Sequence, residues 1–124
     1  MKKSTSINSH SIFLKFYQGK IRCLGTIEDT VNFAKRMEST GISALAIHGR
    51  FKTDRSRFPV KEEYIQAVAE ALSIPVLANG GSNTITDFKT YQEFQERTKT
   101  RGVLIARAAM WNPTCFNPRL KRIY

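Results

Sequence analysis

Three short segments of the chain contain residues that could bind an anion. "IHGR" ends on His48, Gly49 and Arg50, "ANGG" contains Asn79 and two glycines, and "ARAAMWNP" begins with Ala106 and Arg107. Glycines let the backbone turn sharply and bring its N–H groups close to a ligand. An arginine fork pairs well with phosphate oxygens. Of these segments, "ANGG" and "ARAAMWNP" form small-residue turns of the kind that can bind phosphate.

The segment that follows His48 is rich in cations. It contains one acidic residue, Asp54, and four basic ones: Arg50, Lys52, Arg55 and Arg57. A row of cations suits the RNA backbone, although each of them could equally be a solvated surface charge. The whole chain has 20 Lys and Arg against 10 Asp and Glu, a formal net charge of +10. This balance favours an anionic partner such as nucleic acid or a phosphorylated ligand.

Strands and helices must bring these segments together. Four short apolar runs predict strands near residues 20–24, 43–48, 74–78 and 102–106. Three amphipathic segments, within residues 26–40, 60–72 and 84–97, predict the connecting helices. Thr26 is placed to cap the first helix and Gly41 to end it.

The last part of the chain contains further apolar positions. One stripe of the third helix would carry Ile85, Phe88, Tyr91 and Phe94. Beyond the last strand, Trp111 and Asn112 are assigned mostly to packing and a turn, and Pro113 is expected to start a short helix.

Strands that alternate with helices and are almost wholly apolar are typical of parallel βα units covered on both faces. A doubly wound open sheet and an eight-fold βα barrel both use such units and bind ligands at the carboxyl ends of the strands. The dinucleotide fingerprint GxGxxG and the phosphate-binding loop GxxxxGK are absent. Small-residue turns after the last two strands favour the barrel, which commonly binds phosphate there.

The two cysteines, Cys23 and Cys115, are far apart and have no CxxC or Cys/His spacing. They indicate neither a disulfide framework nor a metal site, and a reducing compartment fits best. The apolar run at residues 11–17 is too short for a signal peptide or a membrane span. We therefore expect a cytosolic or nuclear protein, with the cytoplasm preferred, and no membrane partner.

Four motifs, "KIR", "GISALAIHGR", "IPVLANGGS" and "VLIARAAMWNP", occur in this order. Together they resemble the carboxyl half of the catalytic barrel of the flavin-dependent tRNA-dihydrouridine synthases, specifically the eukaryotic tRNA-dihydrouridine(20) synthase-like branch that modifies the D-loop. The resemblance covers roughly residues 19–116. It implies FMN at the strand ends, NADPH or NADH as reductant, and reduction of a tRNA uridine to dihydrouridine.

The resemblance also implies roles for individual residues. Seven would bind the cofactor, two of them beside the flavin (Lys20 and His48) and five around its phosphate (Asn79, Gly80, Gly81, Ala106 and Arg107). Five would bind RNA: Arg22, Arg50, Lys52, Arg55 and Arg57. Lys20 and Arg22 alternate along a strand, so they share one of its faces.

A full barrel needs about 250 residues and eight strands, whereas this chain has four βα units. The expected fold is therefore a half TIM-type barrel over residues 19–118, between a poorly ordered basic arm at 1–18 and a short basic tail at 119–124. A half-barrel leaves two open sheet edges through which the chain could associate with itself.

No catalytic residue is assigned, because in the family the cysteine that protonates the uracil ring belongs to the amino half. Neither Cys23 nor Cys115 lies in that motif. We expect a truncated synthase that is inactive alone, with a non-catalytic RNA- or partner-binding fragment as the alternative. Another phosphate-binding barrel would explain "NGG" but not "HGR" or the charge.

Overall fold

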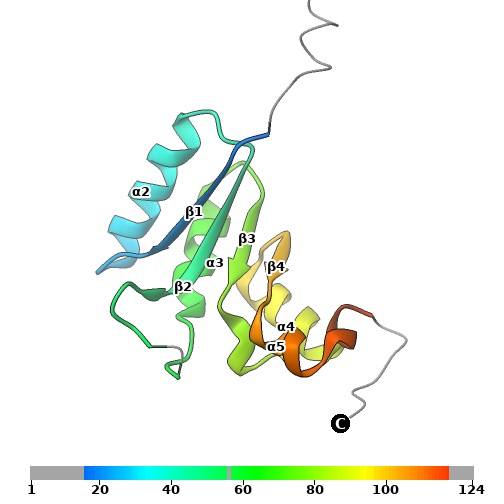
Figure 1. The fold of residues 1–124 in the computed structure, drawn as a ribbon. Helices are drawn as coiled ribbons and strands as arrows, with labels where there is room; N and C mark the ends of the chain where they lie inside the picture. The colour runs from blue at the N-terminus through cyan, green and yellow to red at the C-terminus, as the bar shows by residue number, and fades with distance from the viewer. Residues whose placement is uncertain (1–15, 56, 118–124) are drawn as a thin grey trace, which may run out of the picture.

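Four parallel strands form a single sheet in the computed structural model, which describes residues 16–55 and 57–117. The strands are β1 (Gln18–Cys23), β2 (Ala44–Phe51), β3 (Val76–Asn79) and β4 (Gly102–Leu104). They lie in the order β1-β2-β3-β4, and every neighbouring pair is parallel (Figure 1). The four βα units expected from the sequence are therefore confirmed, as part of a TIM-type barrel.

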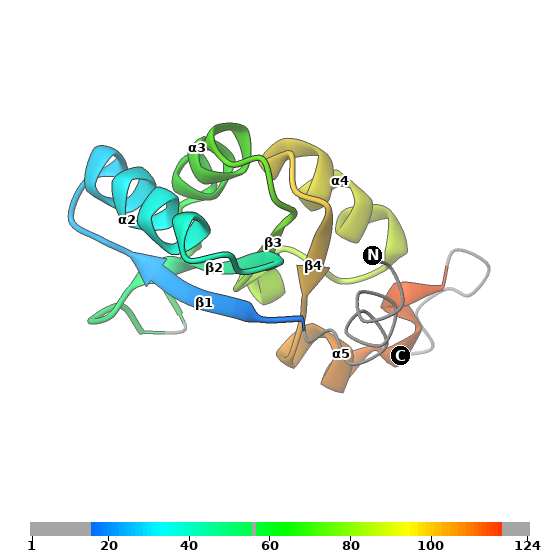
Figure 2. The ribbon, with the colours of Figure 1, turned by 90° about the horizontal axis from the view of Figure 1, so that it is seen from above.

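Three helices cover one face of this sheet. They are α2 (Ile27–Ser39), α3 (Glu62–Ala71) and α4 (Phe88–Thr98), and in Figure 2 they lie side by side above the strands. Their apolar stripes pack on strand residues, and the largest fully buried side chains there include Phe94, Leu45, Ile47 and Ile65. No helix covers the opposite face of the strands as α2, α3 and α4 cover this one, as far as the described residues show.

Helix caps fix where the first and third helices begin. Thr26 accepts a hydrogen bond from the backbone N–H of Asp29 at 3.0 Å, as predicted, and Gly41 follows the helix with φ +92°. Asp87 and Thr90 form a reciprocal capping box at the start of α4. That box starts the helix at Phe88, so the prediction that Ile85 lies on its stripe was wrong, although Ile85 is buried in the loop before it.

Short helices follow the last two strands. They are η1 (Gly81–Asn83), α5 (Arg107–Trp111) and η2 (Pro113–Phe116), which starts at Pro113 as predicted. Asn112 caps η2, and its amide donates to the Thr86 carbonyl at 2.8 Å. The packing role predicted for Trp111 was wrong, because the single turn of α5 buries Ala108 and leaves Trp111 66% exposed.

The ends of the chain are only partly described. Residues 1–15 of the expected basic arm and residues 119–124 of the expected tail lie outside the described residues. Gln18, which we placed in the arm, is already part of β1. Among the described residues, no helix combines the length and apolar character that a membrane crossing requires.

Candidate anion-binding site

The strand register places three polar side chains in one row. Arg22 on β1 lies opposite His48 on β2, and His48 lies opposite Asn79 on β3. In β1 the neighbours of Arg22, Ile21 and Cys23, are buried in the core. Because side chains alternate along a strand, the row therefore faces away from the covering helices, at the carboxyl ends of the strands.

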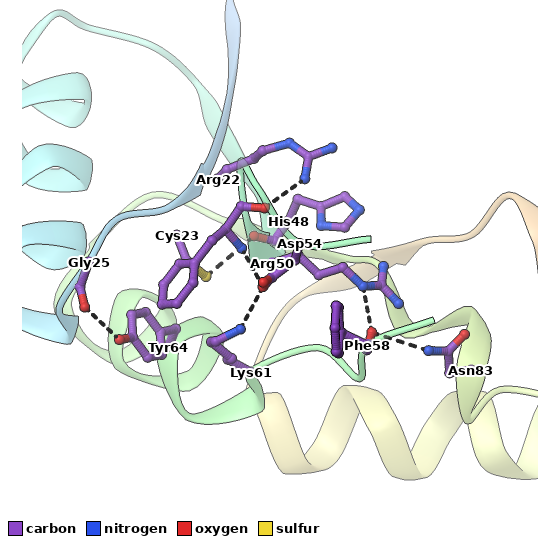
Figure 3. A network of polar contacts seen from close by, with 11 residues as sticks. Arg22, Cys23, Gly25, His48, Arg50, Asp54, Phe58, Lys61, Tyr64 and Asn83 are labelled. Carbon is purple, nitrogen blue, oxygen red and sulfur yellow. Dashed lines mark hydrogen bonds and ion pairs between the residues drawn. The ribbon is translucent and has the colours of Figure 1, made fainter. Parts of the chain in front are cut away.

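A cavity of about 220 Å³ opens at this end of the sheet. Its lining comes from all four strands or the loops that follow them: Arg22, His48, Arg50, Asp54, Asn79, Gly80, Asn83, Ala106 and Arg107. Figure 3 shows the β2 side of this site, with Arg22, His48 and Arg50 close together. The location agrees with the ligand end expected for parallel βα units.

Positive charge dominates the cavity. Arg50 is only 6% exposed, and burial lowers its pKa, with a further decrease from the neighbouring Arg107 guanidinium. The one carboxylate in the lining, Asp54, is bound by Lys61 Nζ at 2.6 Å, and this contact lowers the pKa of Asp54. Guanidinium groups crowded in a partly buried place repel one another, so an anion would be favoured there.

His48 is uncharged at neutral pH. Burial, followed by the charges of Arg22, Arg50 and Lys20, lowers its pKa to about 4. Its Nδ1 is buried and has no hydrogen-bond partner among the described residues. The ring therefore contains an unsatisfied buried nitrogen next to Gly80 and adds no charge to the cavity.

Gly80 allows the backbone to pass close to this ring. Its φ is +103°, in the left-handed region, and a Cβ atom there would lie 2.9 Å from His48 Cε1 and 2.7 Å from Val60 Cγ1. A side chain would therefore be strained and would clash with both neighbours. The glycine keeps the turn after β3 close to His48.

The loop between β2 and α3 is held to the site by hydrogen bonds. The Phe58 carbonyl accepts from Arg50 Nε at 2.7 Å and from Asn83 Nδ2 at 3.3 Å (Figure 3). Lys61 closes the loop, because its backbone N–H donates to the Gly49 carbonyl at 2.7 Å. These bonds therefore hold Phe58 and Lys61 of the loop against the site.

The structure gathers seven of the twelve residues predicted for cofactor or RNA. Those that line the cavity are Arg22, His48, Arg50, Asn79, Gly80, Ala106 and Arg107. The sequence analysis missed Asp54 and Asn83 as lining residues. Their signals were present, because Asp54 is the only acid in a basic loop and Asn83 ends the "NGGSN" segment.

The other five predicted residues lie outside the lining. Lys20 is exposed on the same face of β1, opposite Ala46. Gly81 faces the core, since a Cβ there would lie 2.9 Å from Phe94 Cζ. The remaining three are exposed in the loop after β2: Lys52, Arg55 and Arg57.

Neither cysteine has the character of a reactive thiol. Burial raises the pKa of Cys23 to about 11, and its Sγ donates to the His48 carbonyl at 3.4 Å. Burial also raises the pKa of Cys115. Among residues 16–55 and 57–117, no three His, Cys, Asp or Glu side chains are arranged to hold a metal ion.

Comparison with known proteins adds a family match. The family model described as dihydrouridine synthase matches residues 18–123. A tRNA-dihydrouridine(20a/20b) synthase-like protein of Homo sapiens is 36% identical over 97 residues, which are 78% of this chain and 29% of that protein. The tRNA-dihydrouridine synthase B of Pseudomonas putida is 41% identical over 86 residues, 69% of this chain and 25% of that protein. The chain thus spans less than a third of the length of these two relatives.

Proposed function

The chain belongs to the dihydrouridine synthase family, and on this premise we propose that it is the part of a tRNA-dihydrouridine synthase that holds the phosphate of FMN and faces tRNA. The observation that carries the proposal is the cavity at the strand ends. Arg22, Arg50 and Arg107 face it, and its only carboxylate is already paired with Lys61. A phosphate group would supply the missing negative charge.

The residues at the site fit such a group. Gly80 gives a backbone approach that any Cβ would obstruct, and the buried Nδ1 of His48 lacks a partner. We assign the phosphate to Asn79, Gly80, Gly81, Ala106 and Arg107, with Gly81 contributing only its backbone. Lys20 and His48 would lie beside the flavin ring. When bound, FMN supplies hydride transfer from NADPH or NADH to the uracil ring.

The cations around the cavity would bind the RNA backbone. Arg22 and Arg50 line it, and three more cations are exposed on the loop after β2: Lys52, Arg55 and Arg57. Such contacts would position tRNA without reading its sequence. The names of the relatives specify tRNA and, for the human protein, NAD(P)+. With tRNA as substrate, we expect the protein to act in the cytoplasm.

We further propose that the 124-residue chain does not reduce uridine alone. Protonation of the uracil ring needs a positioned acid, which contributes about a hundredfold or more to the rate. At this site His48, with a pKa of about 4, is neutral at pH 7, and Asp54 is ionised beside Lys61. Cys23 has a pKa raised to about 11 and donates to the backbone instead.

Titration with inorganic phosphate and with FMN tests the cofactor site. We expect weak binding of both, and Arg107→Ala should lower each affinity about tenfold or more, since a hydrogen bond to a charged group contributes about 1.5–3 kcal/mol. Arg101→Ala is the matched control, because Arg101 is exposed at the amino end of β4. Equal effects of the two substitutions would contradict the assignment of Arg107 to a phosphate site. Nanomolar binding of FMN would contradict the proposal that this chain holds only part of the FMN site.

A second assay tests activity. Purified chain, FMN, NADPH and unmodified tRNA are incubated, and mass spectrometry reads the gain of two hydrogen atoms per reduced uridine. We expect no dihydrouridine above a protein-free blank. Formation of dihydrouridine by the unchanged chain, abolished by Lys20→Ala and by Arg107→Ala, would contradict the proposal. It would show that the chain contains a proton donor that we have not identified.

A further inference from the structure

Phe58 is an exposed aromatic residue whose backbone contacts residues that line the cavity. The residue is 43% exposed. Its backbone N–H donates to the Arg55 carbonyl at 3.0 Å, and its carbonyl accepts from Arg50 and Asn83, which both line the cavity (Figure 3). The backbone that carries the ring is therefore tied directly to the anion site.

The ring also lies in a strongly cationic setting. The Arg57 guanidinium is over the Phe58 ring, 5.1 Å from its centroid, and Lys52 and Arg55 are exposed on the same loop. An apolar protein surface that covered this ring would have to remove water from these cations, at considerable cost. Nucleic acid avoids that cost, because it offers a flat base to the ring and phosphates to the cations.

We propose that Phe58 is a stacking platform for one unpaired RNA base at the mouth of the cavity. The inference rests on the proposed function, which makes RNA the ligand. To the proposed contacts with the RNA backbone it adds one contact with an RNA base. Stacking on an aromatic ring tolerates any base, because every base has a flat π-face. Phe58 would therefore add affinity and hold a nucleotide in place without selecting its sequence.

The experiment measures binding of a short single-stranded RNA that carries one 2-aminopurine, whose fluorescence is quenched by stacking. We expect Phe58→Leu to weaken binding about five- to a hundredfold, the range for loss of one stacked base, and to reduce the quenching. Phe58→Trp should restore both. The matched control is Phe16→Leu, which changes a 76% exposed phenylalanine just before the amino end of β1, at the end of the strands opposite the cavity.

Two further measurements separate stacking from charge. The slope of log affinity against log salt reports phosphate contacts, so Phe58→Leu should leave it unchanged whereas Lys52→Ala, which removes an exposed cation of the same loop, should reduce it. Inorganic polyphosphate carries phosphate charges but no bases. The Phe58→Leu variant should therefore bind polyphosphate with the same affinity as the unchanged chain.

The outcomes distinguish this inference from the function on which it rests. Salt-dependent RNA binding that Phe58→Leu and Phe16→Leu affect equally would overturn the platform and leave the proposed function intact. Loss of polyphosphate binding in Phe58→Leu would also overturn it, since the ring would then be supporting the charged loop. Absence of RNA binding by the unchanged chain would overturn both.

Discussion

Two adjacent rows of the sheet have opposite character. One row runs across the strands as Ile21, Ile47, Ala78 and Val103, and each of these side chains is at most 8% exposed beneath the helices. The next row runs as Arg22, His48, Asn79 and Leu104 and faces away from the helices. A step of one residue along each strand thus separates the core from the candidate site.

This difference shows how stability and binding are divided in the chain. Burial of the first row stabilises the fold, because apolar area is removed from water. The second row consists of an arginine, an imidazole, an amide and a leucine, each of which keeps part of its surface exposed. Substitutions in the two rows should therefore affect different measurements, and the predictions below test how complete that separation is.

The largest expected effect is in the apolar row. Ile47 is fully buried in a central strand, so Ile47→Ala should lower the free energy of unfolding by about 2–5 kcal/mol. Arg22→Ala should change it by less than about 0.5 kcal/mol, since Arg22 is exposed. Urea unfolding followed by circular dichroism measures both. If Ile47→Ala fails to fold, Ile47→Val should still lower the free energy of unfolding by about 0.5–1.5 kcal/mol. Equal losses of unfolding free energy for substitutions of Ile47 and of Arg22 would contradict the separation of the two rows.

Gly80 is a position where one substitution should affect both the stability of the fold and the candidate site. Gly80→Ala should cost about 1–3 kcal/mol, because alanine must adopt φ +103° and approach His48 and Val60 too closely. Gly25→Ala is the control, since a Cβ there meets nothing within 4 Å. Unfolding by urea and phosphate titration should both detect the change at residue 80. A stability equal to that of Gly25→Ala would show that the turn after β3 can move without loss.

His48 should make stability depend on pH. Its pKa is about 4 in the folded chain against 6.5 ordinarily, so the unfolded chain takes up the proton first as pH falls. The stability contributed by the neutral ring is therefore present above pH 6.5 and lost progressively towards pH 4. Unfolding free energies of the unchanged chain and His48→Gln, measured across this interval, should show the steeper decline in the unchanged chain. Parallel curves of unfolding free energy against pH for the two proteins would show that His48 titrates alike in the folded and unfolded chain, as a solvent-exposed histidine does.

The smallest expected effect lies outside both rows. Glu38 at the end of α2 accepts hydrogen bonds from the hydroxyl and N–H of Ser73 and from the N–H of Ile74, and these bonds lower its pKa. Its ionised form should stabilise the link between α2 and β3 at neutral pH, and this contribution should be lost as pH falls below 4.5.

Glu38→Gln should therefore lower the melting temperature slightly at pH 7 and progressively less in acid. Glu96→Gln, at an exposed position of α4, is the control. A difference between the two variants that persists unchanged in acid would mean that the Glu38 carboxylate charge does not matter.

The order of strands and helices could be read from the sequence because parallel βα units have regular apolar patterns. The same regularity placed Arg22, His48, Asn79 and Arg107 at one end of the sheet. Boundaries were less predictable: a capping box, not apolar spacing, starts α4 at Phe88. The pairing of Asp54 with Lys61 and the burial of Arg50 depend on how the loop after β2 folds back, and no local pattern specifies that.

The sheet has a further consequence for how the chain folds during synthesis. Among the described residues, each strand pairs only with strands of the neighbouring βα units, and β1 does not pair with β4. Pairing among these four strands therefore needs only units that are adjacent in the sequence. We expect β1 and β2 to associate soon after the second unit leaves the ribosome, and β3 and β4 to add in turn, since cotranslational folding begins at the amino terminus. The order of translation and the order of the strands are the same.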